Sequence, residues 1–153
     1  MKKLFAFFLM LVLLFLSGCS QTVGTSGSGE DVDKWGITLG AESVTATGMT
    51  LTCTQKGGSF TGELLTGSPF VIEQLMDGEW MPVPTVPGIL DWAWTMEGWM
   101  IQPDNTTKWD VNWKFLYDEL APGNYRIKKE IMDFRGPGDY TERPCYAEFA
   151  IVD

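Results

Sequence analysis

Residues 49–54 read Met-Thr-Leu-Thr-Cys-Thr, so that every second side chain is apolar and a threonine stands between. Successive side chains of a strand point to opposite faces. The alternation therefore predicts a β-strand with Met49, Leu51 and Cys53 on its buried face. Residues 107–115 repeat the pattern further along the chain. The side chains that this second run is expected to turn inward are Trp109, Val111, Trp113 and Phe115.

Further strand candidates lie around these two runs, separated by glycine and proline. Asp77-Gly78 stands between two apolar-rich segments and is a strong hairpin signal, because both central turn positions need a positive φ. Residues 91–101, 125–134 and 145–152 are expected to form other strands, and residues 115–120 a single helical turn. About seven or eight short strands without a long amphipathic helix predict an all-β sandwich or barrel.

The first eighteen residues have the layout of an export signal. Two lysines precede an apolar run over residues 4–16, which is too short for a comfortable membrane span of about 20 residues. The segment Leu16-Ser17-Gly18-Cys19 that follows resembles the lipobox of bacterial lipoproteins. The resemblance implies cleavage after Gly18 and lipid attachment to Cys19, which would anchor the protein in a membrane, facing away from the cytoplasm. The alternative is an ordinary secretory signal (residues 1–18) with an incidental cysteine.

The expected mature chain divides into a tether and one domain. Residues 19–34 are rich in Gly, Ser and Thr and predict a flexible tether with a reach of roughly 20 Å, followed by a domain over residues 35–153. Removal of the signal leaves 9 basic against 20 acidic residues and a net charge of -11, which argues against a nucleic-acid partner. The chain has no histidine, so Ser-His-Asp and Cys-His catalytic sites and His-ligated zinc are excluded.

Residues 120–127 read Leu-Ala-Pro-Gly-Asn-Tyr-Arg-Ile. They resemble the segment before the penultimate strand of immunoglobulin-like and fibronectin-like sandwiches, in which the tyrosine hydroxyl bonds upstream backbone. Together with residues 61–64, the Asp-Gly hairpin and residues 146–149, the span 36–152 resembles the bacterial immunoglobulin-like (Big-type) domains of surface lipoproteins. The resemblance implies an immunoglobulin-like β-sandwich of antiparallel strands. It also implies an adhesive or structural role with no catalytic residues and no cofactor.

Two cysteines besides Cys19 fall on expected inward faces. Cys53 and Cys145 are about ninety residues apart, and an exported compartment would permit a disulfide between them. Such a bond would stabilise the fold by about 4–5 kcal/mol in the chain-entropy model. The alternative is a pair of buried thiols that pack as small apolar side chains.

The tryptophans are the main functional lead. A domain of this size rarely buries seven indoles, so some are expected at the surface. Trp92, Trp94 and Trp99 would form an apolar contact for a protein or an envelope polymer. In a carbohydrate-binding module, the same rings would stack on a sugar. The alternatives are that Trp92 and Trp94 complete the core, or that Asp91 and Glu97 serve a small hydrolase. The sequence favours a non-catalytic interaction module, without a metal site.

Overall fold

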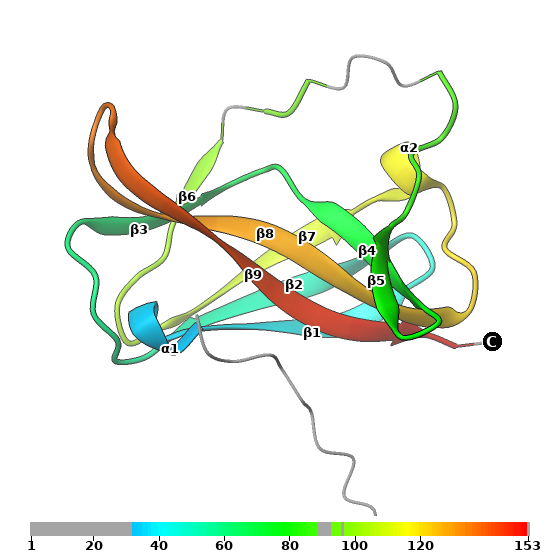
Figure 1. The fold of residues 1–153 in the computed structure, drawn as a ribbon, viewed down its shortest axis with the longest axis horizontal. Coiled ribbons are helices and arrows are strands. Elements are labelled where there is room, and N and C mark those ends of the chain that lie inside the picture. The colour runs from blue at the N-terminus through cyan, green and yellow to red at the C-terminus, as the bar shows by residue number, and fades with distance from the viewer. Residues whose placement is uncertain (1–31, 89–92, 96, 153) are drawn as a thin grey trace, which may run out of the picture.

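The computed structural model of the protein describes residues 32–88, 93–95 and 97–152 (Figure 1). Strands dominate this part of the chain, and each of its two helices is a single turn. The helices are α1 (Val32–Trp35) and α2 (Lys114–Tyr117). The strands are β1 (Ile37–Thr45), β2 (Gly48–Gln55), β3 (Glu63–Gly67), β4 (Val71–Met76), β5 (Glu79–Pro82), β6 (Gly98–Met100), β7 (Thr106–Asn112), β8 (Gly123–Gly136) and β9 (Asp139–Ile151).

These strands form two antiparallel sheets that pack face to face. Sheet A has the order β1-β2-β7. In sheet B, β9 lies along one side of the long strand β8, and β3 and β4 lie along its other side. The short strands β6 and β5 pair with β3 and β4 at the edge of this sheet. The predicted all-β sandwich is therefore confirmed (Figure 1).

The strands β3 and β4 are two parts of one line of pairing along β8. Thr66 of β3 pairs with Ile131, and Val71 of β4 pairs with Lys128. The four residues 67–70 therefore stand opposite only two residues of β8, and the chain bulges there. This bulge and the short edge strands bring the number of strands in the described residues to nine, above the seven or eight expected.

Inward side chains of both sheets form two adjoining apolar clusters. The alternation predicted for residues 49–54 is confirmed, because Met49, Leu51 and Cys53 are at most 5% exposed. The first cluster contains Met49, Leu51, Ile72, Trp113, Leu116, Tyr117, Leu120, Tyr125, Ile127, Ala147, Phe149 and Ile151. The second contains Trp35, Ile37, Cys53, Leu64, Ile101, Ile131 and Cys145. Burial of a large apolar side chain stabilises by roughly 1.5–3 kcal/mol, so these clusters hold the sheets together.

The predicted alternation over residues 107–115 ends at Trp113. Trp113 is fully buried, and Trp109 and Val111 are half-buried on the inner face of β7. The prediction for Phe115 is wrong, because its side chain is 62% exposed. The strand ends before Trp113 and the chain turns into α2, so the period changes from two residues to 3.6 and alternation no longer applies.

Three local predictions are confirmed. Asp77 and Gly78 have φ values of 52° and 86°, as a tight hairpin turn between β4 and β5 requires. The hydroxyl of Tyr125 donates to the carbonyl oxygen of Ala121 at 2.8 Å, which fixes the corner before β8. The single helical turn expected within residues 115–120 is α2.

Several described elements begin or end at other residues than the predicted segments. The helix α1 begins at Val32, three residues before the expected start of the domain. Of the strand expected over residues 91–101, the described part contains only β6. The predicted signal peptide, Cys19 and most of the predicted tether lie outside the described residues. Within the described residues, no helix combines the length and the hydropathy that a membrane crossing needs.

Candidate functional site

Aromatic side chains line one flank of the sandwich, where β7 of sheet A lies beside the β3–β6 edge of sheet B. Two of the three tryptophans predicted to bind a ligand, Trp94 and Trp99, lie here and are half-buried. The third, Trp92, lies outside the described residues. We call this region the aromatic flank, and it consists of Phe70, Trp94, Trp99, Trp109, Tyr117 and Lys129.

The indoles of the aromatic flank pack on other rings. Trp94 meets Phe70 edge-on with 5.1 Å between ring centroids, and Phe70 lies 6.4 Å from Tyr117. Trp99 lies 5.8 Å from Trp109, which joins the edges of the two sheets. Aromatic pairs of this kind contribute about 0.5–1.5 kcal/mol beyond their buried area. These contacts therefore favour a stabilising role for Trp94 and Trp99, and their role in ligand binding stays a prediction.

A buried lysine lies beneath these rings. Lys129 is only 3% exposed, and its Nζ donates to the carbonyl oxygens of Gly67 and, at 2.9 Å, Pro69. The ammonium lies 5.5 Å from the centroid of Trp99. No carboxylate of the described residues lies within ion-pair distance of it. Burial therefore lowers the pKa of Lys129 to about 8, and the side chain serves to hold the bulge at residues 67–70 in place.

The outer face of sheet B carries another aromatic group, which the sequence analysis did not single out. The guanidinium of Arg126 lies between two rings, 4.6 Å from the centroid of Trp80 and 4.1 Å from that of Tyr146. Its Nε donates to Oε2 of Glu73 at 2.5 Å. We call Trp80, Arg126 and Tyr146 the outer stack.

The register of sheet B brings the outer stack together. On β8, Arg126 stands directly between Glu73 of β4 and Glu148 of β9. The rings come from the two flanking segments, since Trp80 lies on β5 and Tyr146 on β9. Both rings are half-buried and keep part of their surface in solvent. The same face therefore offers aromatic, cationic and anionic groups within a few residues of one another.

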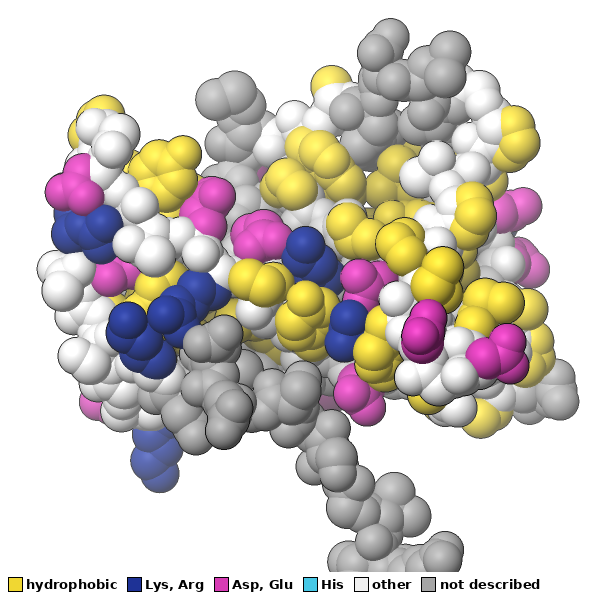
Figure 2. All heavy atoms as spheres, in the orientation of Figure 1, with side chains coloured by type: hydrophobic (Ala, Val, Ile, Leu, Met, Phe, Trp, Pro, Cys, Tyr) yellow, Lys and Arg dark blue, Asp and Glu magenta, His cyan; other side chains and the backbone are white. Residues whose placement is uncertain are grey.

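Apolar side chains extend this face on both sides of the outer stack. Beside the stack, Val71 and Leu75 are 37% and 38% exposed. Towards the β8–β9 turn lies a further group that shares the outward side of the sheet, namely Leu65, Met100, Met132, Phe134 and Tyr140. Figure 2 shows apolar side chains gathered over this sheet, with acidic and basic ones between them. An exposed apolar surface rimmed by polar groups is typical of an interaction site.

Part of the outer stack was within reach of the sequence. Apolar residues alternate at 145, 147, 149 and 151, and the inward face expected for Cys145 therefore places Tyr146 on the outward side. Trp80 gave no such signal, because apolar residues stand on both faces of its hairpin. Its position depends on the pairing of β5 with β4, where Trp80 lies opposite Leu75.

The outer face of sheet A is different in kind. Its centre is threonine, and Thr54 lies in register between Thr38 and Thr106. Its charged groups are engaged, because Lys108 pairs with Glu42 at 2.7 Å. Aromatic side chains are lacking among the outward positions of β1, β2 and β7. This face is hydrated and gives a partner little apolar area to bury.

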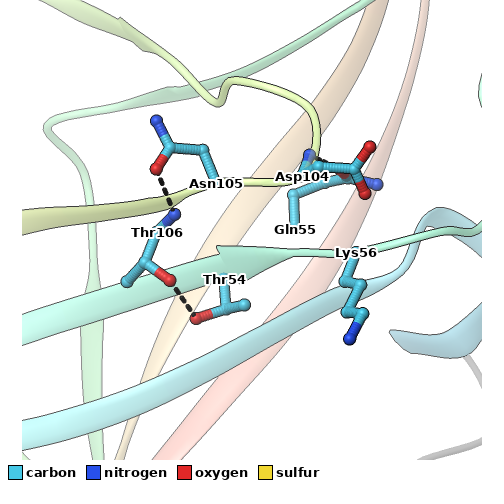
Figure 3. Close-up of a pocket in the computed structure, with 6 residues that line it drawn as sticks. All are labelled: Thr54, Gln55, Lys56, Asp104, Asn105 and Thr106. Atoms are coloured by element: carbon cyan, nitrogen blue, oxygen red, sulfur yellow. Dashed lines mark hydrogen bonds between the residues drawn. The ribbon is translucent and has the colours of Figure 1, made fainter.

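A shallow depression of about 330 Å³ lies at one end of sheet A (Figure 3). Its polar groups bond one another: the Thr54 and Thr106 hydroxyls are 2.9 Å apart, and the amide of Asp104 donates to the Gln55 side chain at 2.8 Å. Gln55 also donates to two backbone carbonyls and is 2% exposed. The network joins β2 to the start of β7, and these side chains therefore stabilise the sheet.

Cys53 and Cys145 lie in the same buried cluster but on different sheets. Cys53 belongs to β2 of sheet A and Cys145 to β9 of sheet B. Burial, and then the neighbouring Cys145, raise the pKa of Cys53 to about 12, so it is a thiol at neutral pH. The structure holds both residues as thiols, and the disulfide stays a prediction.

The structure does not test Asp91 and Glu97 as a hydrolytic pair. Asp91 lies outside the described residues, and Glu97 is exposed and accepts a hydrogen bond from Thr95 at 3.4 Å. The described residues contain no group of three or more His, Cys, Asp or Glu side chains that would hold a metal.

Comparison with known protein families gives a match that spans nearly all of the sandwich. A family described as a bacterial Ig-like domain matches residues 32–150, from α1 into the last strand. The chain belongs to the bacterial Ig-like domain family. Such domains are typically non-catalytic interaction modules outside the cytoplasm. Neither curated proteins nor solved structures include a significant match to this bacterial Ig-like domain.

Proposed function

We propose that this protein is an exported, lipid-anchored interaction module that binds a protein partner through the outer face of sheet B. The outer stack carries the proposal. Trp, Tyr and Arg are the residue types most enriched at the energetic centres of protein interfaces, and here they meet on a solvent-facing sheet. The family supports a non-catalytic role of this kind.

The fixed position of Arg126 also supports a binding site on the outer face of sheet B. Arg126 is held by two rings and by Glu73, so its long side chain has already lost most of its rotamer freedom before a partner arrives. Ordering a flexible side chain on binding costs about 0.5–1.5 kcal/mol, and a fixed side chain avoids most of that cost. The rigid sheet beneath fixes the spacing of the contacts.

The proposed anchor is Cys19, through the lipobox-like segment that ends the signal. In the described residues the domain begins with α1, which lies at the end of the sandwich away from the β4–β5 turn (Figure 1). Metabolic labelling with a fatty acid tests the anchor. We expect label in the wild type and none in Cys19→Ser, and an unlabelled wild type would overturn the anchor.

Site-directed photo-crosslinking in the intact envelope tests the binding face. A photoreactive amino acid replaces Ala150 on the outer face of sheet B, Thr52 on the outer face of sheet A, or Thr95 beside Trp94 of the aromatic flank. We expect a discrete protein adduct only from position 150, and we expect Trp80→Ala to abolish it.

The other crosslinking outcomes are equally informative. Adducts only from position 95 would overturn the outer face and move the site to Trp94 and Trp99. Equal adducts from all three positions would indicate collision without a site. A shift of tryptophan emission by a soluble envelope polysaccharide, lost in Trp94→Phe or Trp99→Phe, would favour the carbohydrate-binding alternative.

A further inference from the structure

We infer that the outer face of sheet B binds a cationic partner, a protein surface whose arginine and lysine side chains surround an apolar contact. The inference rests on the proposed function and specifies the chemistry of its partner. It follows from the charges on this face. Acidic side chains outnumber basic ones, and both basic side chains are held in ion pairs whereas some of the acidic ones are not.

The basic groups of the face are already neutralised. Arg126 pairs with Glu73 at 2.5 Å and Lys128 with Glu130 at 3.2 Å. The hydrogen bond that Lys128 donates to Glu130 raises the pKa of Lys128, with burial opposing and the charge of Glu130 adding to the effect, so this lysine stays protonated in its pair. Neither cation is left to attract an anionic partner.

Three carboxylates of the face remain without an ion pair in the described residues. They are exposed and stand on the outward side of β3 and β9, and they are Glu63, Glu142 and Glu148. The face therefore holds five acids against two bases, a net charge of -3. Like charges across an interface are costly and opposite charges steer association, so this surplus selects positive partners and rejects nucleic acids and anionic lipid.

The rings give a partner cation a specific place. Trp80 and Tyr146 contact Arg126 and are only half-buried, and we expect the exposed part of these residues to accept a second cation. A cation over an aromatic face contributes about 0.5–1 kcal/mol at an exposed site, and more when water is excluded. A partner arginine would extend the alternation of ring and guanidinium, with Glu148 near enough along β9 to share its charge.

The test uses the ¹⁵N-labelled full chain in a zwitterionic detergent and three acetylated pentapeptide amides. The peptides are Gly-Arg-Tyr-Arg-Gly, its Gln counterpart and its Glu counterpart. We expect the Arg peptide to bind about tenfold more tightly than the Glu peptide at low salt, and to move the indole resonance of Trp80 and the amides of β8 and β9. The preference is expected to shrink as ionic strength rises.

Matched variants locate the charges. Glu148→Gln is expected to weaken binding of the Arg peptide by about two- to fivefold, as the loss of one exposed ion pair would. Glu42→Gln, on the outer face of sheet A, is expected to change nothing.

The outcomes separate the two proposals. Equal or tighter binding of the Gln or Glu peptide at the outer stack would overturn the cationic partner and leave the binding face intact. Shifts confined to the aromatic flank or to sheet A, with any of the peptides, would overturn both. The same holds if none of the peptides moves the outer stack.

Discussion

The aromatic flank and the outer face of sheet B are both rich in tryptophan, tyrosine and a basic side chain, yet they use these residues in opposite ways. On the flank, Trp99 lies against Trp109 and over a lysine that is 3% exposed. On the outer face, Trp80 and Tyr146 hold a guanidinium that belongs to a solvent-facing strand position. The aromatic flank packs the edge of the sandwich, and the outer stack lies on its solvent-facing surface.

The side of the strand on which an aromatic cluster lies, and not its residue types, therefore decides whether the cluster stabilises the fold or is available to a partner. Neighbouring residues of β8 make the point, since Lys129 points into the sandwich and Arg126 and Lys128 point out. Inside, a cation loses its water and its pKa falls. Outside, a cation keeps an acidic partner and remains charged.

The largest expected effect is on folding, from Trp99→Ala. Removal of this half-buried ring leaves a gap beside Trp109 and Lys129, and we expect the free energy of unfolding to fall by about 2–4 kcal/mol. Trp80→Ala is the matched variant on the outer face, where we expect a loss of about 1 kcal/mol or less. Urea denaturation followed by far-UV circular dichroism measures both. Equal losses would show that the two regions do not differ.

The next effect is the pH dependence set by Lys129. Its pKa in the folded state is about 8, against 10.5 for a lysine in water, so between these values the unfolded chain binds more protons. The contribution of Lys129 to the free energy of unfolding is therefore expected to rise with pH from about 8 to 10, by on the order of 1–3 kcal/mol, whereas the raised pKa of Cys53 gives an opposite contribution above about pH 9. Lys129→Met should remove this rise, which urea titrations across the range would reveal. A rise of the same size in Lys129→Met would assign it to other groups.

A smaller effect is expected from Arg126→Lys. A lysine keeps the charge but loses the planar stacking between Trp80 and Tyr146 and the Nε bond to Glu73. We expect about 1 kcal/mol less stability by denaturation and a several-fold weaker adduct in the crosslinking assay. Lys108→Arg on the outer face of sheet A is the control, and an equal loss there would argue against a special role for the outer stack.

The smallest change is in fluorescence. Acrylamide is expected to quench part of the wild-type emission, and Trp80→Phe is expected to remove more of the quenchable fraction than Trp94→Phe or Trp99→Phe, without a measurable change in stability. Trp92→Phe belongs in the same series. Quenching carried mainly by Trp94 and Trp99 would contradict the structural role that we assign to the aromatic flank.

The sequence predicted the parts of the fold that local chemistry decides. The alternation over residues 49–54, the Asp77-Gly78 turn and the hydrogen bond of Tyr125 all depend on a few adjacent residues, and all are confirmed. Phe115 was misplaced because a strand and a helix follow each other without a breaker between them. The period alone gives no sign of where that change occurs.

The position of the outer stack depends on how several strands pair, which the pattern of a single strand does not predict. Trp80 and Tyr146 are more than sixty residues apart, and they meet at Arg126 only through the registers of β5 with β4, β4 with β8 and β8 with β9. The bulge at residues 67–70 shifts one of these registers by two positions relative to β3. Local patterning does not specify such a shift.

The chain enters one sheet and the proposed binding face lies on the other, which has a mechanical consequence. The chain enters the domain through the helix α1 and then β1, an edge strand of sheet A, whereas the proposed binding face belongs to sheet B. A pull between a membrane anchor and a bound partner would therefore act as a shear between the sheets, borne by the side chains of the two core clusters. Cys53 and Cys145 lie in one buried cluster, one on each sheet. A disulfide between them would link the two sheets covalently and raise the force that is needed to slide one past the other.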